Sequence, residues 1–278
     1  MGHRGALYDE LENTLASFQR CLDLGCDAVE LDVYLLKDGS LIVFHGGDTL
    51  ENPGDLTEYC VGMHGVSILD LDYAKTQELR FNDQFAEFGC NSDIIGKGRI
   101  PTLKEVLDLV QGTSMTVKIE LKGEGTVCPT LRLVEEMNMV HQCHFSSFAL
   151  DRIREIRDLH PERIEDGTHK YKTGALFDDA TSPYSPDDFL ELAEEVGASE
   201  VHLCYDLCSV DRVRAIHARN MRTMAWFRGP IGMRSDIATK WTDVGNEDDS
   251  MYLAVAETGV HQLCLNRPCV AVKLWNRV

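Results

Sequence analysis

The sequence predicts an α/β fold, a (β/α)8 TIM barrel that forms a single catalytic domain over residues 1–278. Short apolar runs alternate with amphipathic segments along the whole chain, as parallel strands alternate with their crossover helices. The length of 278 residues suits one barrel of this kind. Seven runs after residue 26 have the character of barrel strands, so a closed barrel needs one more.

The strand-like runs are apolar or β-branched and are bounded by turn residues. The first, 27–36, is followed by a turn and a shorter run, 41–45. The missing first strand would precede His3, where Met1 and Gly2 form only a truncated piece of it. We therefore expect a natural chain that is longer at this end, and weak support for His3 and Arg4. The alternative is a barrel that closes with this short segment alone. The other predicted barrel strands are 114–122, 139–145, 173–177, 200–205, 222–227 and 260–265.

The predicted helices carry start and stop signals. Residues 13–25 have apolar side chains at helical spacing and end at Gly25. In the helix predicted over 102–112, Thr102 is the N-cap and Glu105 follows three residues later, as in a capping box. Three further helices are predicted over 149–159, 185–197 and 209–220.

Residues 46–100 interrupt this alternation. The segment is far longer than an ordinary βα loop and is rich in Gly, Asp and Asn. One short helix is predicted within it, near residues 69–79. We interpret 46–100 as an insertion after the second barrel strand that caps the mouth of the barrel.

The charge of the chain limits the ligands that it can bind. Its formal net charge is −19, from 27 Lys and Arg against 46 Asp and Glu. Nucleic acids bind through Lys and Arg, so the sequence predicts no nucleic-acid partner, and anionic membrane surfaces are disfavoured. An apolar run of about 18 residues would be needed for a transmembrane segment, and none is predicted. An anionic substrate would require a local positive centre.

Ten cysteines are present, and none of them forms a Cys-x-x-Cys pair. Several, such as Cys204 and Cys264, lie within apolar runs. We interpret them as buried free thiols of a reducing, cytoplasmic compartment. A zinc site is the alternative, but no ligand spacing supports it.

Carboxylates recur at positions where barrel enzymes place functional residues. Glu30 and Asp32 stand two apart in a strand and share one face, and Glu120 and Lys122 repeat this spacing. Three carboxylates that converge in the barrel repel one another unless a cation is present. Oxygen ligands favour Mg²⁺ or Ca²⁺, with Mn²⁺ as a further candidate. The alternative interpretation is ion pairing with Lys118 or Lys122.

Two histidines flank these carboxylates. His45 closes the run 41–45, and His3 would close the missing first strand, so both would emerge at the same rim. Two histidines beside a metal form a suitable general acid/base pair. The alternative for each is a structural role, which is common for a single histidine at a strand end.

Several sequence segments occur in a specific order. They are HRGA (3–6), ENTLASF (12–18), GCDAVELDVYLLKDGSLIVFH (25–45), RIPTLKEVLDLV (99–110), VKIELK (117–122), FSSF (145–148) and AWF (225–227). In this order the chain resembles the glycerophosphodiester phosphodiesterase family from residue 3 to about 268, most strongly before residue 122. The resemblance implies a (β/α)8 barrel with an insertion, which hydrolyses glycerophosphodiesters to glycerol 3-phosphate and an alcohol with one divalent cation.

The resemblance also implies a mechanism. One histidine removes a proton from water or from the neighbouring glycerol hydroxyl, and the other protonates the leaving alkoxide. Carried over residue by residue, the implied roles are Glu30, Asp32 and Glu120 as metal ligands, His3 and His45 as the acid/base pair, Arg4 and Lys122 as phosphate-binding residues, and Glu12 as a supporting residue.

The chain departs from the family pattern at three places. Gly46 and Gly47 follow His45, where the family usually has Asp. Asn266, in CLNRP, replaces the acid of the family's Thr-Asp-x-Pro segment. Phe227 and Arg228 replace small polar residues. Arg228 could favour a more anionic substrate, with a surface salt bridge as the alternative.

Two other functions fit the sequence less well. A phospholipase D-type enzyme acting on lysophospholipid or sphingolipid head groups would need an apolar rim in 46–100, where only residues 61–69 are mildly apolar. A non-catalytic barrel that serves as a binding module would be favoured if the truncated first strand prevents barrel closure. The expected ligand is a small-molecule glycerophosphodiester or lysophospholipid.

Overall fold

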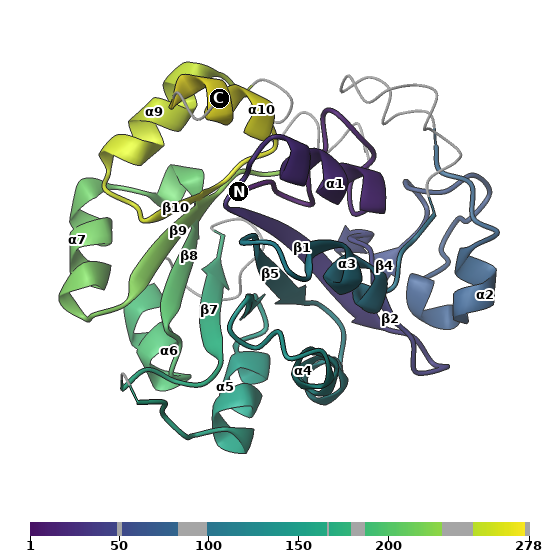
Figure 1. Cartoon of the computed structure of the whole chain (residues 1–278), viewed down its shortest axis with the longest axis horizontal. Helices are drawn as coiled ribbons and strands as arrows, with labels where there is room; N and C mark the ends of the chain where they lie inside the picture. The colour runs from purple at the N-terminus through teal and green to yellow at the C-terminus, as the bar shows by residue number, and fades with distance from the viewer. Residues whose placement is uncertain (49–51, 83–98, 166, 179–186, 230–246, 276–278) are drawn as a thin grey trace.

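The computed structural model describes residues 1–48, 52–82, 99–165, 167–178, 187–229 and 247–275 (Figure 1). A curled sheet lies at its centre, with the strand order β10-β9-β8-β7-β6-β5-β1-β2. The strands are β1 (Ala28–Leu35), β2 (Leu41–Val43), β5 (Thr116–Leu121), β6 (Cys143–Ser147), β7 (Lys172–Phe177), β8 (Glu200–Cys204), β9 (Arg222–Trp226) and β10 (Gln262–Cys264).

The pairing within this sheet is parallel from β1 and β5 through to β10, whereas β2 folds back antiparallel onto β1. The seven predicted strands are thus confirmed as strands of the curled sheet. One boundary was wrong: β6 begins at Cys143, because the chain from Met139 to Gln142 turns after a helix, with Gln142 N–H donating to the Met139 carbonyl at 2.9 Å.

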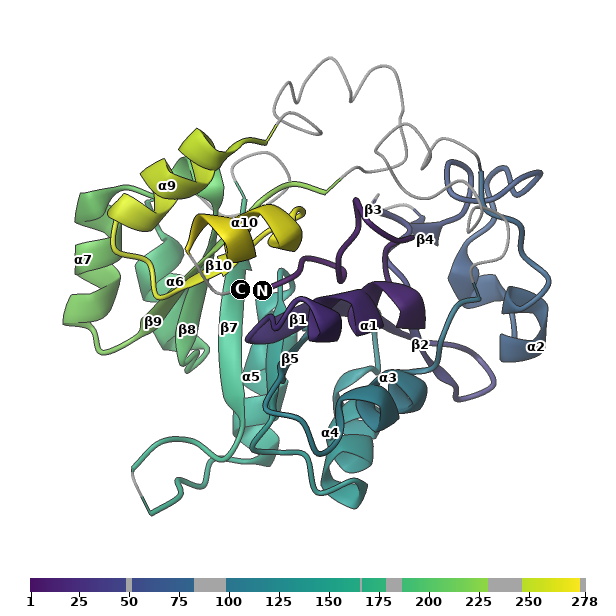
Figure 2. The same ribbon diagram turned by 45° about the horizontal axis from the view of Figure 1, so that its top comes forward.

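The Met1–Gly2 segment pairs with strands on both of its sides (Figure 2). The Gly2 N–H donates to the Ala28 carbonyl at 3.1 Å, and the Gly2 carbonyl accepts from the Glu30 N–H at 2.8 Å. On the other side the His3 N–H donates to the Leu265 carbonyl at 3.0 Å. The segment therefore joins β1 to the end of β10, consistent with an α/β barrel, and gives His3 firmer support than we expected.

Only glycine fits at position 2. A Cβ atom there would lie 2.5 Å from the Cys21 sulfur, far inside van der Waals contact. This close approach lets the short N-terminal segment lie against α1 (Leu15–Asp23) while it pairs with β1.

Helices surround the curled sheet (Figure 1). The predicted capping box is confirmed, with Thr102 and Glu105 bonded reciprocally at the start of α3. No helix among the described residues has the length and apolar character that a membrane crossing requires. Besides α1 the helices are α2 (Tyr73–Thr76), α3 (Leu103–Val110), α4 (Val127–Glu136), α5 (Leu150–Leu159), α6 (Phe189–Glu195), α7 (Val210–Ala218), α9 (Asp249–Glu257) and α10 (Pro268–Leu274), of which α4, α9 and α10 were not predicted.

The main core lies between the sheet and the helices. Val29, Leu31 and Val33 are completely buried there, together with Phe18 of α1 and Val106 of α3. Because side chains alternate along a strand, the even-numbered residues of β1 point to the opposite face, into the curled sheet. This alternation determines which side chains meet at the interior.

The segment 46–100 has its own small core beside β2. It contains the short strands β3 (Gly47–Asp48) and β4 (Pro53–Asp55), a 3₁₀ turn at Ile68–Asp70, and α2, which lies within the predicted helical region. Tyr59 and Phe81 pack against Phe44, with ring centroids 5.3 and 6.4 Å from it. Residues 49–51 and 83–98 lie outside the described residues, so the capping role of this segment stays a prediction.

The cysteines of the described residues are free thiols, and Cys90 lies outside that part of the chain. Cys21, Cys60, Cys143, Cys204 and Cys264 are buried. Cys128 is exposed. The prediction of buried free thiols thus holds for these five.

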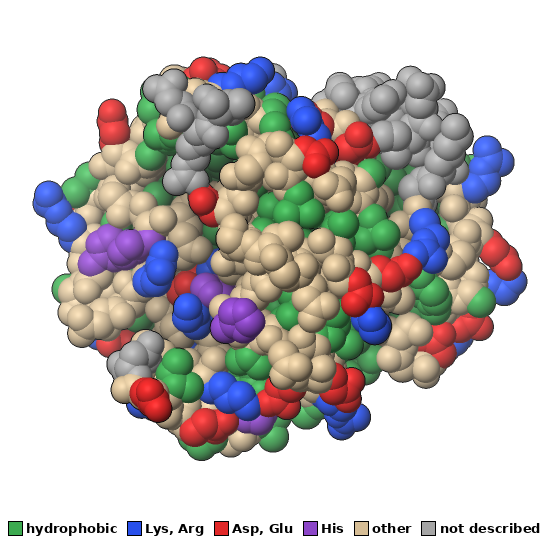
Figure 3. Space-filling model, in the orientation of Figure 1, with side chains coloured by type: hydrophobic (Ala, Val, Ile, Leu, Met, Phe, Trp, Pro, Cys, Tyr) green, Lys and Arg blue, Asp and Glu red, His purple; other side chains and the backbone are tan. Residues whose placement is uncertain are grey.

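On the face of the molecule shown in Figure 3, Lys and Arg side chains are scattered among Asp and Glu side chains. Among the described residues drawn on that face, no continuous basic area is visible. This distribution agrees with the acidic balance of the sequence.

A second group of charged side chains lies inside the sheet, around Glu200 of β8. The Lys118 ammonium donates to Glu200, the His202 Nε2 lies 2.9 Å from Glu200 Oε2, and the His144 Nδ1 lies 3.3 Å from Glu200 Oε1. Gly174 provides the space, since a Cβ there would lie 2.2 Å from the His202 ring. Lys118 is thus committed to Glu200, and the alternative that it pairs with the predicted metal-binding carboxylates was wrong.

Burial and the charges within this group shift the pKa values of its members in different directions. Burial lowers the pKa of both His144 and His202 below 6.5, although Glu200 acts in the opposite direction. Burial alone would raise the pKa of Glu200, but Lys118 and the two histidines outweigh it and hold the pKa well below its usual range. Both histidines are therefore neutral at neutral pH, beside an ionised Glu200.

We expect the free energy of unfolding to decrease as the pH falls below about 6.5, by up to about 1 kcal/mol per pH unit for each histidine. In this range the unfolded chain binds protons that native His144 and His202 do not, so acidification favours unfolding. The ionised Glu200 adds to the loss at still lower pH, because its native pKa is lowered. Urea unfolding between pH 7.5 and 5 measures the slope.

The His202→Gln variant is the comparison, since it removes one of the buried histidines whose pKa is lowered. Its slope against pH should be shallower than that of the unmodified chain, whatever its absolute stability. An identical slope in both proteins would show that His202 does not carry the effect.

Candidate active site

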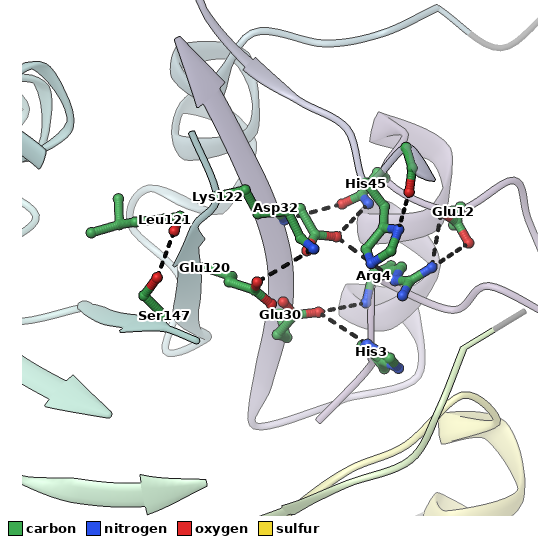
Figure 4. Close-up of polar contacts among 12 residues, drawn as sticks. His3, Arg4, Glu12, Glu30, Asp32, His45, Glu120, Leu121, Lys122 and Ser147 are labelled. Carbon is green, nitrogen blue, oxygen red and sulfur yellow. Dashed lines mark hydrogen bonds and ion pairs between the residues drawn. The ribbon is translucent and has the colours of Figure 1, made fainter. Parts of the chain in front are cut away.

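Three carboxylates meet on the inner face of two neighbouring strands of the curled sheet (Figure 4). Glu30 and Asp32 lie on β1, and Glu120 lies on β5, where it pairs in register with Asp32. One oxygen from each side chain lies within 4.8 Å of the other two, and all three residues are buried. We call Glu30, Asp32 and Glu120 the acidic triad.

The electrostatics of the acidic triad are those of a cation site. Burial, followed by the charges of Asp32 and Glu120, raises the pKa of Glu30 well above its ordinary value. These effects outweigh the nearby charge of Arg4, so a further cation would stabilise the ionised form of Glu30. All the donor atoms are carboxylate oxygens, which suit a divalent cation of the Mg²⁺ or Ca²⁺ kind.

Arg4 lies against the acidic triad and is held from several directions. Its Nη1 donates to both Glu12 carboxylate oxygens at 3.2 Å, and its Nε lies 3.7 Å from Asp32 Oδ2. Its backbone N–H donates to Glu30 Oε2 at 3.0 Å. Burial opposes the charge of Arg4, but Glu12 and Asp32 outweigh it and raise the pKa of the guanidinium. Arg4 therefore stays charged within the site.

The backbone around Arg4 has an unusual conformation that α1 supports. Arg4 has a φ of 52°, in the left-handed region, and its carbonyl accepts from the Asn13 N–H at 2.9 Å and the Ser17 hydroxyl at 3.2 Å. The Asn13 side chain donates to Asp32 Oδ2 at 2.9 Å. Thr14 caps α1 by accepting from the Ser17 N–H. The segment before α1 thus positions both a cation and a carboxylate of the site.

His3 approaches the acidic triad from the N-terminal segment. Its Nε2 lies 3.8 Å from Glu30 Oε2, and its Nδ1 lies 2.7 Å from Asn266 Oδ1. Burial, followed by the charge of Arg4, lowers the pKa of His3 to about 3, against the hydrogen bond with Asn266. The imidazole is therefore neutral at neutral pH.

His45 lies on the other side of Arg4 (Figure 4). Its Nδ1 lies 2.6 Å from the Gly46 carbonyl and 3.1 Å from the Tyr59 hydroxyl. Because a carbonyl only accepts, Nδ1 carries the hydrogen and Nε2 has the lone pair. Burial, followed by the charges of Arg4 and Lys122, lowers the pKa of His45 well below its ordinary value.

Lys122 follows β5 and completes the group. Its Nζ lies 3.4 Å from Glu120 Oε1 and 3.7 Å from Asp32 Oδ1. Next to it, the Ser147 hydroxyl of β6 donates to the Leu121 carbonyl at 2.8 Å, which joins the ends of the two strands. Lys122 and Arg4 thus place two cations beside the triad in a chain of strongly negative net charge.

Arg228 lies in different surroundings from those that we expected. It is only 6% exposed, and its Nη2 lies 3.1 Å from Asp178 Oδ1 and 2.8 Å from Asp206 Oδ2. The alternative of a salt bridge is thus confirmed, with the exposed Asp206 as one partner, although Arg228 and Asp178 are themselves buried. Two carboxylates balance the charge that we expected to attract a more anionic substrate.

The structure brings the predicted site residues together: His3, Arg4, Glu12, Glu30, Asp32, His45, Glu120 and Lys122. Sequence analysis assigned no role to Asn13, Tyr59 or Glu247, and treated Asn266 only as a departure from a family pattern. Asn13 could have been found from its place in the segment ENT. Tyr59 and Glu247 have no such signal, because their contacts join distant parts of the chain.

A model of the glycerophosphoryl diester phosphodiesterase family matches residues 3–268. The chain belongs to this family. The resemblance that the sequence motifs indicated is thereby confirmed.

The sequence identity to individual relatives is low. The chain is 31% identical over 166 residues to a glycerophosphodiester phosphodiesterase of Caldanaerobacter subterraneus, an alignment covering 58% of this chain and 62% of that protein. It is 30% identical over 143 residues to a human lysophospholipase D, covering 51% of this chain and 42% of that protein. The chain thus spans less than two thirds of these relatives.

Solved structures resemble the whole fold. A putative glycerophosphodiester phosphodiesterase from Galdieria sulphuraria has a TM-score of 0.75 at 24% identity, covering 99% of this chain and 95% of that chain. An Oleispira antarctica phosphodiesterase, solved in complex with the product sn-glycerol-3-phosphate, has a TM-score of 0.70 at 21% identity, covering 99% and 94%. At these identities the likeness supports the fold alone.

Proposed function

We propose that the chain is a phosphodiesterase that hydrolyses glycerophosphodiesters to glycerol 3-phosphate and an alcohol. The observation that carries this proposal is the meeting of the acidic triad with His3 and His45 in one buried group. Membership of the glycerophosphoryl diester phosphodiesterase family supports it. So do the activities named for the relatives, one of which was solved with sn-glycerol-3-phosphate as product.

One divalent cation, Mg²⁺ or Ca²⁺ with Mn²⁺ as a further candidate, fits the acidic triad. Glu30, Asp32 and Glu120 would hold it, and the pKa of Glu30, raised by burial and then by the charges of Asp32 and Glu120, supports a cation there. When bound, such a cation stabilises negative charge that develops on a phosphodiester.

Arg4 and Lys122 are the proposed contacts of the phosphate oxygens. Both are cationic and lie beside the acidic triad. Glu12 holds the Arg4 guanidinium through two hydrogen bonds and so restricts its orientation. A guanidinium that is already oriented loses little freedom when it binds a phosphate.

The two histidines are the proposed acid/base pair. Both are neutral at neutral pH, since burial lowers their pKa values, and a neutral imidazole accepts a proton. One of them removes a proton from the nucleophile, which is water or the neighbouring glycerol hydroxyl. The other takes up a proton from solvent when the anionic phosphodiester is bound, and donates that proton to the leaving alkoxide.

The proposed architecture is a (β/α)8 barrel over residues 1–278 in which Met1 and Gly2 form a short first strand. The two-sided pairing of Gly2 supports this arrangement. The segment 46–100 is the proposed insertion at the barrel mouth, and Tyr59 links it to His45.

A phospholipase D-type activity on lysophospholipids is the second candidate. Its support is the relative named as a lysophospholipase D and the side chain of Val61, which is 58% exposed in the segment 46–100. The binding-module alternative has less support, because Gly2 joins β1 to the end of β10.

Hydrolysis of glycerophosphocholine, with and without EDTA, tests the proposed function. We expect activity with added Mg²⁺ or Ca²⁺ and its loss on chelation, because uncompensated carboxylates would repel the phosphate. Lysophosphatidylcholine, assayed in parallel, distinguishes the second candidate. Activity that survives both EDTA and the His3→Ala and His45→Ala substitutions would disprove the mechanism, and inactivity on every such substrate would favour a binding module.

A further inference from the structure

A chain of hydrogen bonds leads from His3 away from the acidic triad. His3 Nδ1 lies 2.7 Å from Asn266 Oδ1, and Asn266 Nδ2 donates to the Arg228 carbonyl at 2.8 Å and to Glu247 Oε1. The Tyr252 hydroxyl donates to Glu247 Oε2 at 2.9 Å. All of these side chains are buried, and Asn266 and Tyr252 are completely so.

The chemistry of the partners determines the orientation of the Asn266 amide. The Arg228 carbonyl and the Glu247 carboxylate both accept hydrogen bonds, so the amide nitrogen must face them. The amide oxygen is then the atom that faces His3, and it accepts only. His3 Nδ1 must therefore carry the hydrogen, which leaves the lone pair on Nε2, the nitrogen nearer to Glu30.

We propose that Glu247 is a positioning residue for His3 and acts through the Asn266 amide. The predicted effect on kcat rests on the proposed function, whereas the predicted orientation of the His3 ring does not. Glu247 orients the amide, and the amide holds the His3 ring with Nε2 toward the acidic triad. At His45 it is the Gly46 backbone carbonyl that accepts from Nδ1.

The pairing of Asn266 with Glu247 also explains why an amide is present at this position. A carboxylate at 266 could accept from His3, but it would face the Glu247 carboxylate and the Arg228 carbonyl without a hydrogen to donate. Buried like charges in contact are destabilising. An amide is the side chain that accepts from His3 and donates to both other partners.

Three variants test the pairing: Asn266→Asp, Glu247→Gln, and the double variant that combines them. In the double variant the new glutamine can donate to the new carboxylate, which in turn accepts from His3 Nδ1. We expect Asn266→Asp to lower kcat for glycerophosphocholine by about 10- to 100-fold through misplacement of His3, with a smaller change in KM. The double variant should recover most of this loss. Glu257→Gln, which changes an exposed carboxylate at the end of α9, should have no effect.

The ¹⁵N NMR spectrum of histidine-labelled protein reads the tautomer of His3 without any substrate, with the His3→Gln spectrum providing the assignment. We expect a single Nδ1–H form in the unmodified chain. In Asn266→Asp we expect a mixture of ring forms, because the Glu247 carboxylate repels the new carboxylate away from His3. The single form should return in the double variant. An Nε2–H form in the unmodified chain would overturn the proposal, as would a double variant no better than Asn266→Asp. Because the spectrum needs no turnover, an enzyme inactive on every substrate tested would contradict the proposed function and leave the relay to be judged by NMR.

Discussion

We expect the His45→Ala variant to hydrolyse glycerophosphodiesters roughly 10²- to 10⁴-fold more slowly than the unmodified chain, the range lost with a general acid or base. Its Nδ1 is bonded to the Gly46 carbonyl, so the ring presents Nε2 in a fixed orientation near Arg4 and Lys122. The loss should appear in kcat, because the ring acts on a proton in the transition state. Steady-state kinetics with glycerophosphocholine measure it.

His64→Ala is the control for this prediction, because His64 is exposed and lies in the same segment 46–100. It should retain full activity. Tyr59→Phe should lower the rate much less than His45→Ala, since the Gly46 carbonyl remains as a partner of Nδ1. Equal rates for His45→Ala and His64→Ala would contradict the assignment of His45 to catalysis.

The Glu200→Gln variant should lose about 3–5 kcal/mol of stability, the range for breaking a buried ion pair. Glu200 is only 2% exposed and accepts from Lys118, which is 1% exposed. Glutamine has nearly the same shape, so the loss would come from the uncompensated ammonium and not from a cavity. Denaturant unfolding at pH 7.5 measures it.

The matched control is Glu195→Gln, which breaks an exposed pair with Arg154 at 2.8 Å and should cost less than about 1 kcal/mol. Adding Lys118→Met to Glu200→Gln should restore part of the stability, because no buried charge is then left alone. An equal loss of unfolding free energy in Glu200→Gln and Glu195→Gln would contradict the prediction, because the buried ion pair would then contribute no more than the surface pair.

Local patterns predicted the elements that need only local information. The alternation in β1 placed Glu30 and Asp32 on one face, and the spacing of Thr102 and Glu105 indicated a capping box. Both depend on the geometry of a few consecutive residues. The predicted start of β6 was wrong because it also relied on local pattern alone. The apolar residues from Met139 onward resemble a strand but form a turn.

Contacts between distant residues were beyond any such pattern. Lys118 was an alternative partner of the carboxylates, yet it bonds to Glu200, 82 residues away. His3 and Asn266 are 263 residues apart in the chain and 2.7 Å apart in space. The residues next to either partner in the sequence contain no pattern that predicts the contact.

The sequence by itself determined the alternation of strands and helices, the face on which Glu30 and Asp32 lie, and the motifs by which the family is known. Only the tertiary structure decided that Gly2 pairs with the chain on both of its sides and that Glu200 forms an ion pair with Lys118. The same holds for Asn266, which is hydrogen-bonded to both His3 and Glu247. The physical reason is the difference between the two kinds of interaction. Periodicity and capping act over a few residues, whereas closure of the curled sheet brings its two ends together and selects their partners by shape and charge.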